Sequence, residues 1–223
     1  MSHKRLAGFL SATALAAVLS FSAGAANAAV TIQNGSFELG PDPGVFTTLG
    51  NGNTSITGWT VGGDSIDYIG SYWQPGDGNR SIDLSGNGKG SIWQDLTGLT
   101  VGTTYHVKFL LAGNPDGGAS TKVAVASDGG TQADVFMFSQ PGNTKASMGW
   151  TQQTFSFMAF DPTARLAFSA TANDPYGPAI DGVSISPVPE PATWAMMIIG
   201  FGGAGAMLRR NRQRHNDQLL QAA

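Results

Sequence analysis

The chain has 223 residues, of which 31 are glycine, 11 are proline, none is cysteine and 12% are charged. Its 41% of hydrophobic residues can bury a core, which excludes general disorder, and the absence of cysteine excludes disulfides, thiolate nucleophiles and cysteine-ligated zinc. The net charge of −3 excludes a nucleic-acid binder that works by neutralising phosphates.

Residues 1–28 have the three parts of a secretory signal peptide. Lys4 and Arg5 precede an apolar stretch over residues 6–21, and two alanines flank Asn27. This order predicts cleavage between Ala28 and Ala29 and therefore export of the chain. A buried N-terminal helix is the alternative interpretation.

Residues 29–187 are expected to form one domain in which period-two alternation dominates. Tyr105, Val107, Phe109 and Leu111 fall on one face of a predicted strand, and His106 falls on the other. No convincing amphipathic helix is present, and clusters of Gly, Pro, Asn and Asp separate the runs. We therefore predict an all-β, antiparallel two-sheet sandwich of the jelly-roll type. The same alternation occurs in residues 121–127, 154–159, 164–170 and 179–185.

An ordered set of short segments carries a family resemblance. The segments are Asn34–Glu38, Ile56–Val61, Ser65–Ile69, Gly90–Leu96, Gly102–Phe109 and Ile180–Ile185. Together they resemble the choice-of-anchor C group, which is related to galactose-binding-like and carbohydrate-binding jelly rolls. The resemblance implies the same sandwich and an exported surface domain.

The resemblance also implies a structural Ca²⁺ site that joins the first and last strands, with Glu38 and Asp181 as ligands. Ca²⁺ prefers several oxygen ligands, and residues 29–188 contain 13 acidic against 6 basic side chains, which makes a divalent cation plausible. The alternative is that Glu38 is exposed and Asp181 caps a turn.

Aromatic residues next to a polar loop are candidates for sugar stacking. Tyr72 and Trp73 precede a Gly-rich loop and are expected to be exposed, with Asp77 and Arg80 binding sugar hydroxyls. The alternative is that these aromatic rings only pack the loop. Two further tryptophans, Trp59 and Trp93, lie in strand patterns and are expected in the core.

Residue types favour a noncatalytic protein. His106 is expected on the solvent side of its strand, no Gly-x-Ser-x-Gly turn occurs, and residues 29–188 contain a single Glu. We expect adhesion or matrix assembly, with polysaccharide as a candidate partner. The alternatives are a weak carbohydrate-active hydrolase or esterase that uses Asp and Ser residues, and a purely structural surface protein.

A sorting signal is predicted over residues 188–214. Pro189, Glu190 and Pro191 precede Trp194, which opens an apolar run over 194–208, and Arg209 and Arg210 begin a basic cluster that also contains Arg212 and Arg214. This order resembles the PEP-CTERM signal of Gram-negative bacteria.

The PEP-CTERM resemblance implies cleavage by an inner-membrane exosortase near Pro189 to Pro191 and delivery of the domain to the cell surface or extracellular matrix. Fifteen helical residues cover about 22 Å, slightly less than the hydrocarbon core of a bilayer. The apolar run is therefore predicted to be a short transmembrane helix with the arginines on the cytoplasmic side. Residues 215–223 would form a cytoplasmic tail, although such signals usually end soon after the arginines.

Overall fold

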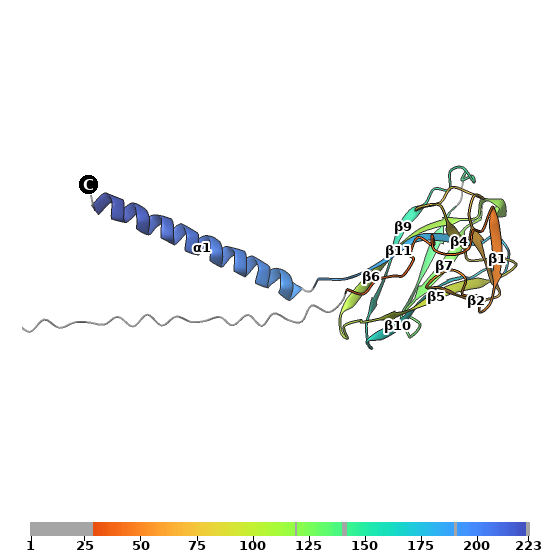
Figure 1. The fold of residues 1–223 in the computed structure, drawn as a ribbon, viewed down its shortest axis with the longest axis horizontal. Helices are drawn as coiled ribbons and strands as arrows, with labels where there is room; N and C mark the ends of the chain where they lie inside the picture. The colour runs from red at the N-terminus through yellow and green to blue at the C-terminus, as the bar shows by residue number, and fades with distance from the viewer. Residues whose placement is uncertain (1–28, 119, 140–141, 190, 222–223) are drawn as a thin grey trace, which may run out of the picture.

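The computed structural model describes residues 29–118, 120–139, 142–189 and 191–221. The predicted signal peptide, residues 1–28, lies outside the described residues. Figure 1 shows a β-sandwich followed by the helix α1.

One layer of the sandwich is a six-stranded antiparallel sheet. Its last strand in sequence, β11, lies in the centre between β4 and β6, so the C-terminal end of the domain is built into the middle of the layer. In spatial order the strands are β1 (Phe46–Gly50), β3 (Ser65–Ile69), β4 (Ser81–Asp83), β11 (Pro178–Pro187), β6 (Thr104–Gly113) and β9 (Thr151–Met158).

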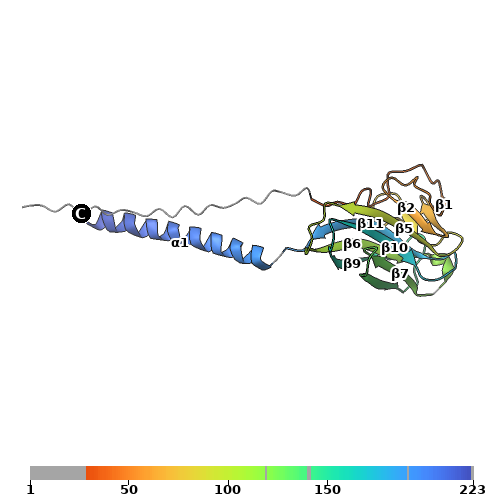
Figure 2. The same cartoon turned by 90° about the horizontal axis from the view of Figure 1, so that it is seen from below.

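The second layer is a five-stranded antiparallel sheet (Figure 2). The chain crosses repeatedly between the two sheets from β4 onward, which is the jelly-roll arrangement that the sequence predicts. A short 3₁₀ turn, η1 (Pro115–Gly117), follows β6. In spatial order the strands are β2 (Thr60–Gly63), β5 (Gly90–Thr97), β10 (Thr163–Ala170), β7 (Lys122–Ser127) and β8 (Ala133–Phe138).

The core between the sheets follows from the alternation of apolar residues. In β6 the side chains of Tyr105, Val107 and Phe109 are buried, and His106 is half-exposed on the outer face, as predicted. Phe109 meets Phe168 of β10 edge-on, with 4.9 Å between ring centroids. Each buried side chain of this size contributes about 1.5–3 kcal/mol, so contacts across the two sheets account for much of the stability.

The two strand tryptophans differ in position. Trp59 is buried, as expected. The prediction for Trp93 is wrong, because alternation in β5 directs Ile92 and Gln94 inward and leaves Trp93 half-buried on the outer face. There the Arg165 guanidinium lies 3.7 Å from the centroid of the Trp93 ring.

Helix α1 (Pro191–Gln221) contains the predicted apolar run 194–208 and continues through the arginine cluster into the predicted tail. Figure 1 shows it projecting away from the sandwich. Within the described residues, no helix combines the length and the hydropathy that a membrane span requires, so the predicted transmembrane crossing is not confirmed.

A close backbone contact beside β11 gives a test of the packing. Gly35 lies against Val183, whose amide donates to the Gly35 carbonyl oxygen at 2.9 Å, and a Cβ on Gly35 would collide with the Val183 carbonyl oxygen. We expect Gly35→Ala to lower the free energy of unfolding by about 1–3 kcal/mol, because backbone atoms must shift.

Urea unfolding of a fragment comprising residues 29–188 measures this effect. The matched control is Gly50→Ala, because a Cβ on Gly50 meets nothing within 4 Å. Equal stability of the two variants would contradict the contact.

Candidate functional site

The loop of residues 70–80, between β3 and β4, is held in place by a carboxylate from the far end of the domain. Asp181 of β11 is fully buried, and its Oδ2 accepts hydrogen bonds from the amides of Gly76 (2.9 Å) and Asp77 (2.8 Å). Its Oδ1 accepts from the amide of Gly182 at 2.7 Å. The two bonds to Oδ2 therefore fix the middle of the loop on the sheet, and they are stronger when the carboxyl is ionised.

A second carboxylate holds the end of the same loop. Oε1 of Glu38 accepts from the amides of Asn79 (2.7 Å) and Arg80 (2.9 Å). Gly78 adopts φ of +66°, and a Cβ there would lie 2.5 Å from this oxygen, so glycine is needed for the carboxylate to reach the backbone. The two residues predicted to bind calcium therefore hold one loop from two sides.

The same geometry bears on a metal-binding role for Glu38 and Asp181. Both carboxylates already accept backbone amides, and Oε1 of Glu38 and Oδ2 of Asp181 each accept two. Within the described part of the chain, no group of three or more His, Cys, Asp or Glu side chains is placed to hold a metal ion. The two side chains alone provide few of the oxygen ligands that Ca²⁺ takes.

The predicted sugar-binding residues share the loop but do not form one open surface. Trp73 is only 4% exposed and its indole Nε1 donates to Ser81 Oγ at 2.8 Å, so the prediction that it is exposed is wrong. Its burial follows from the position of the loop, which covers the outer face of β4. Arg80 Nη1 donates to Tyr68 Oη at 2.6 Å and to the Gly40 carbonyl at 3.0 Å, which fixes a neighbouring loop. Asp77 is exposed.

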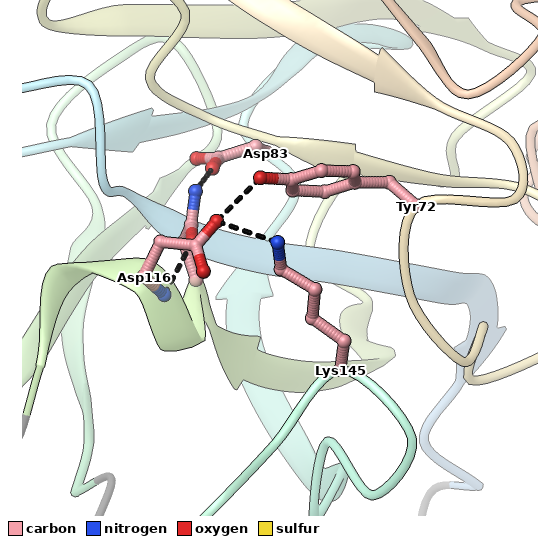
Figure 3. Close-up of polar contacts among 5 residues, drawn as sticks. Tyr72, Asp83, Asp116 and Lys145 are labelled. Atoms are coloured by element: carbon pink, nitrogen blue, oxygen red, sulfur yellow. Dashed lines mark hydrogen bonds and ion pairs between the residues drawn. The ribbon is translucent and has the colours of Figure 1, made fainter.

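Tyr72 is enclosed by charged neighbours from other loops. Figure 3 shows its hydroxyl and the Lys145 ammonium both directed at the carboxylate of Asp116 in η1. The Lys145 Nζ lies 3.9 Å from the centroid of the Tyr72 ring, and Phe46 meets the ring edge-on. The Tyr72 hydroxyl, followed by Lys145, lowers the pKa of Asp116. Tyr72 thus links three segments rather than offering a free face to a sugar.

An open hollow of about 810 Å³ lies beside the loop. Trp73 and Arg80 of the predicted set contribute to it, whereas Tyr72 and Asp77 do not. Its wall combines apolar atoms with a carboxylate, a hydroxyl, an amide and a guanidinium. The lining residues are Asp42, Pro43, Gly44, Val45, Gly70, Ser71, Trp73, Pro75, Asn79 and Arg80.

A fully buried carboxyl, Asp83, lies near this loop on β4 (Figure 3). It accepts from the Ser85 amide at 2.9 Å and from Asn114 Nδ2 at 2.8 Å, and it stands opposite Asp67 in the β3–β4 register. Burial raises the pKa of Asp83 to about 8 and that of Asp181 to about 7. Burial also raises the pKa of Asp67.

Sequence reasoning missed most of the hollow. Asp42 belongs to a Pro-Asp-Pro-Gly turn, which signals a loop but not its neighbours. Ser71 and Asn79 carry no motif, and Asp83 follows an ordinary strand pattern. Only the fold shows that residues 42–45 and 70–80 face one space.

Two family models match the chain. One, described as protein of unknown function (DUF642), covers residues 30–186. The chain belongs to this DUF642 family. The second, the PEP-CTERM protein-sorting motif, covers residues 187–213 and confirms the predicted sorting signal.

Relatives and solved structures show further similarity. This DUF642 chain is 35% identical over 168 residues to halomucin from Haloquadratum walsbyi, a match that covers 72% of the chain but 2% of halomucin. It resembles TmCBM61 in complex with β-1,4-galactotriose (TM-score 0.44, 15% identity, 70% of this chain and 97% of that one). It also resembles CBM35 from Cellvibrio japonicus Abf62 (TM-score 0.43, 13% identity, covering 63% of this chain and 92% of that one).

The buried carboxyls predict a pH-dependent stability. The unfolded chain releases these protons near pH 4, whereas the native carboxyls retain them up to about pH 7 and pH 8. Between about pH 4 and these values, the native state therefore binds more protons than the unfolded chain. We expect the free energy of unfolding to fall as pH rises from about 4 to about 8, by up to about 1.4 kcal/mol per pH unit for each carboxyl.

Chemical unfolding across this pH range checks the slope. Asp83→Asn should remove the contribution of Asp83 to the slope of unfolding free energy against pH and leave the contribution of Asp181. Asp134→Asn is the matched control, because Asp134 is exposed on the edge strand β8. An unchanged slope in Asp83→Asn would contradict the assignment.

Proposed function

We propose that this protein is an exported, noncatalytic surface or extracellular-matrix protein that binds polysaccharide in the hollow beside residues 70–80. Such binding would serve adhesion or matrix assembly.

The lining of the hollow carries the proposal. Sugars present apolar faces and many hydroxyl groups, and binding sites for them combine apolar surface with a few directed polar groups. Exposed Val45, with the largely buried Pro43 and Trp73, supplies the apolar part, and Asp42 and Asn79 supply exposed polar groups.

The sorting motif supports the location. Its match at 187–213 indicates an exported protein that is handled by an exosortase, as is typical of Gram-negative bacteria. We propose that the inner-membrane precursor begins at Ala29 after signal cleavage and is cut near Pro189 to Pro191. In this proposal the apolar run 194–208 holds the precursor at the membrane only until that cut.

The noncatalytic assignment is supported by the carboxylates near the hollow. Hydrolysis of a glycosidic bond by the usual mechanism needs two carboxyl groups beside the substrate. Asp42 is the one acidic residue among the described residues that line the hollow. Asp67 and Asp83 are paired in register, but Asp83 is fully buried and neither lines the hollow.

Removing two polar groups from the hollow tests the sugar-binding proposal. We expect the double variant Asp42→Ala, Asn79→Ala to bind its polysaccharide about tenfold more weakly, because two hydrogen bonds of about 0.5–1.5 kcal/mol each are lost. A glycan array identifies the ligand of the wild-type domain, and calorimetry then compares the variants.

The control is Asp134→Ala, which removes an exposed carboxylate on β8 outside the hollow. Equal binding by both variants at equal melting temperature would place the sugar elsewhere. No binding by the wild-type domain to any glycan would favour the purely structural protein.

A structural Ca²⁺ ion held by Glu38 and Asp181 stays a prediction. A free Ca²⁺ concentration of a hundred times the dissociation constant would stabilise the fold by about 2.7 kcal/mol. Thermal melts in calcium and in chelator should then differ, and Asp181→Ala should abolish most of the difference. Identical wild-type melts would mean that these carboxylates serve only as acceptors for the loop amides.

A further inference from the structure

The last strand of the sandwich ends inside the sorting motif. Pro187, the first residue of the motif, is also the last residue of β11 and pairs with Tyr105 of β6. The amide of the next residue, Val188, donates to the Thr104 carbonyl at 2.8 Å. The first two residues of the motif therefore belong to the folded sheet.

Little chain remains between the sheet and helix α1. Only positions 189 and 190 separate Val188 from Pro191, where α1 begins, and three Cα–Cα steps span at most about 11 Å. A peptidase draws its substrate into the cleft as an extended strand and contacts residues on both sides of the scissile bond. A cut near Pro189 to Pro191 therefore requires one of the two flanking elements to open.

The end of β11 has a built-in point at which opening can stop. The register with β6 shifts between Asp181 and Ser184, and Gly182 within that shift has φ of +56°. Val183 is anchored separately by its bond to Gly35. The bulge divides β11 into a central half that carries Asp181 and a terminal half. We count Val188, which bonds to Thr104 just beyond the end of β11, with this terminal half, residues 184–188.

The terminal half is held weakly. Within the described part of the chain, this half pairs with β6 alone, since β4 pairs with Ala179 and Ile180 of the central half. Ser184, Ser186 and Pro187 are exposed, and Ile185 is half-buried. Few buried contacts therefore oppose fraying of this half, while the core beyond the bulge stays packed.

We propose that the terminal half of β11 is a gate for sorting, and that the exosortase cleaves the chain only in the frayed form, in which residues 184–188 have left β6. This inference rests on the proposed exosortase processing. In this proposal, the pairing of β6 with the terminal half of β11 controls the rate at which the precursor matures.

A reversible cross-link across the ladder tests the gate in the full-length precursor. Ser186 lies opposite His106, and both side chains lie on the outer face, so Ser186→Cys with His106→Cys places two thiols within disulfide range. The native chain has no cysteine, so no other disulfide can form. Ser91→Cys with Ser169→Cys, a facing pair in the other sheet, is the matched control.

Pulse-chase labelling in the producing cells, with mass spectrometry of the C-terminus, measures processing. The oxidised 106–186 pair should slow processing by about tenfold or more relative to the parent chain, because cleavage follows the population of the open form. Added reductant should restore the rate, and the control pair should mature like the parent. A flexible Gly-Ser insertion between Val188 and Pro189 should also rescue the oxidised pair.

Processing of the oxidised 106–186 pair at the parent rate would overturn the gate. A variant with Pro189, Glu190 and Pro191 replaced serves as the unprocessed reference. If the parent chain retains its C-terminus as this variant does, the proposed processing is overturned, and the gate with it. These outcomes differ in the parent chain, so the two failures are distinguishable.

Discussion

Two carboxylates from opposite ends of the domain, Glu38 and Asp181, accept the backbone amides of a single loop, and the outer face of the six-stranded sheet depends on this contact. Asp181 and Gly76 are 105 residues apart in sequence, so the clamp exists only once β11 has entered the centre of the sheet. Burial raises the pKa of Asp181 to about 7, whereas the amides of Asp77, Gly182 and Gly76 lower it, so these amides favour the ionised form that burial disfavours.

The position of the loop then determines what lies around it. With residues 76–80 fixed, Trp73 is pressed onto β4, Arg80 reaches the Gly40 carbonyl, and the hollow forms between the two loops. The same strand that supplies Asp181 continues past a bulge into the sorting motif. One strand therefore links the candidate binding surface to the sorting motif.

The sequence predicts what depends on local periodicity and misses what depends on distant contacts. The alternation around Tyr105 identifies β6 and the sandwich, whereas β8 lacks a clear period because it is an edge strand with Val135 and Met137 outward. Glu38 and Asp181, predicted from the sequence as ligands of one Ca²⁺ ion, both accept amides of one loop, and the ion itself stays a prediction. The burial of Trp73 could not be predicted, because it depends on a loop that a residue far along the chain holds in place.

Amide hydrogen exchange of the wild-type domain, read residue by residue, tests the clamp most directly. The amides of Gly76, Asp77, Asn79 and Arg80 should be protected although they lie in a loop, and Glu38→Ala should expose Asn79 and Arg80 while Gly76 and Asp77 stay protected. Exchange of all four wild-type amides at the rate of an unstructured chain would contradict the account.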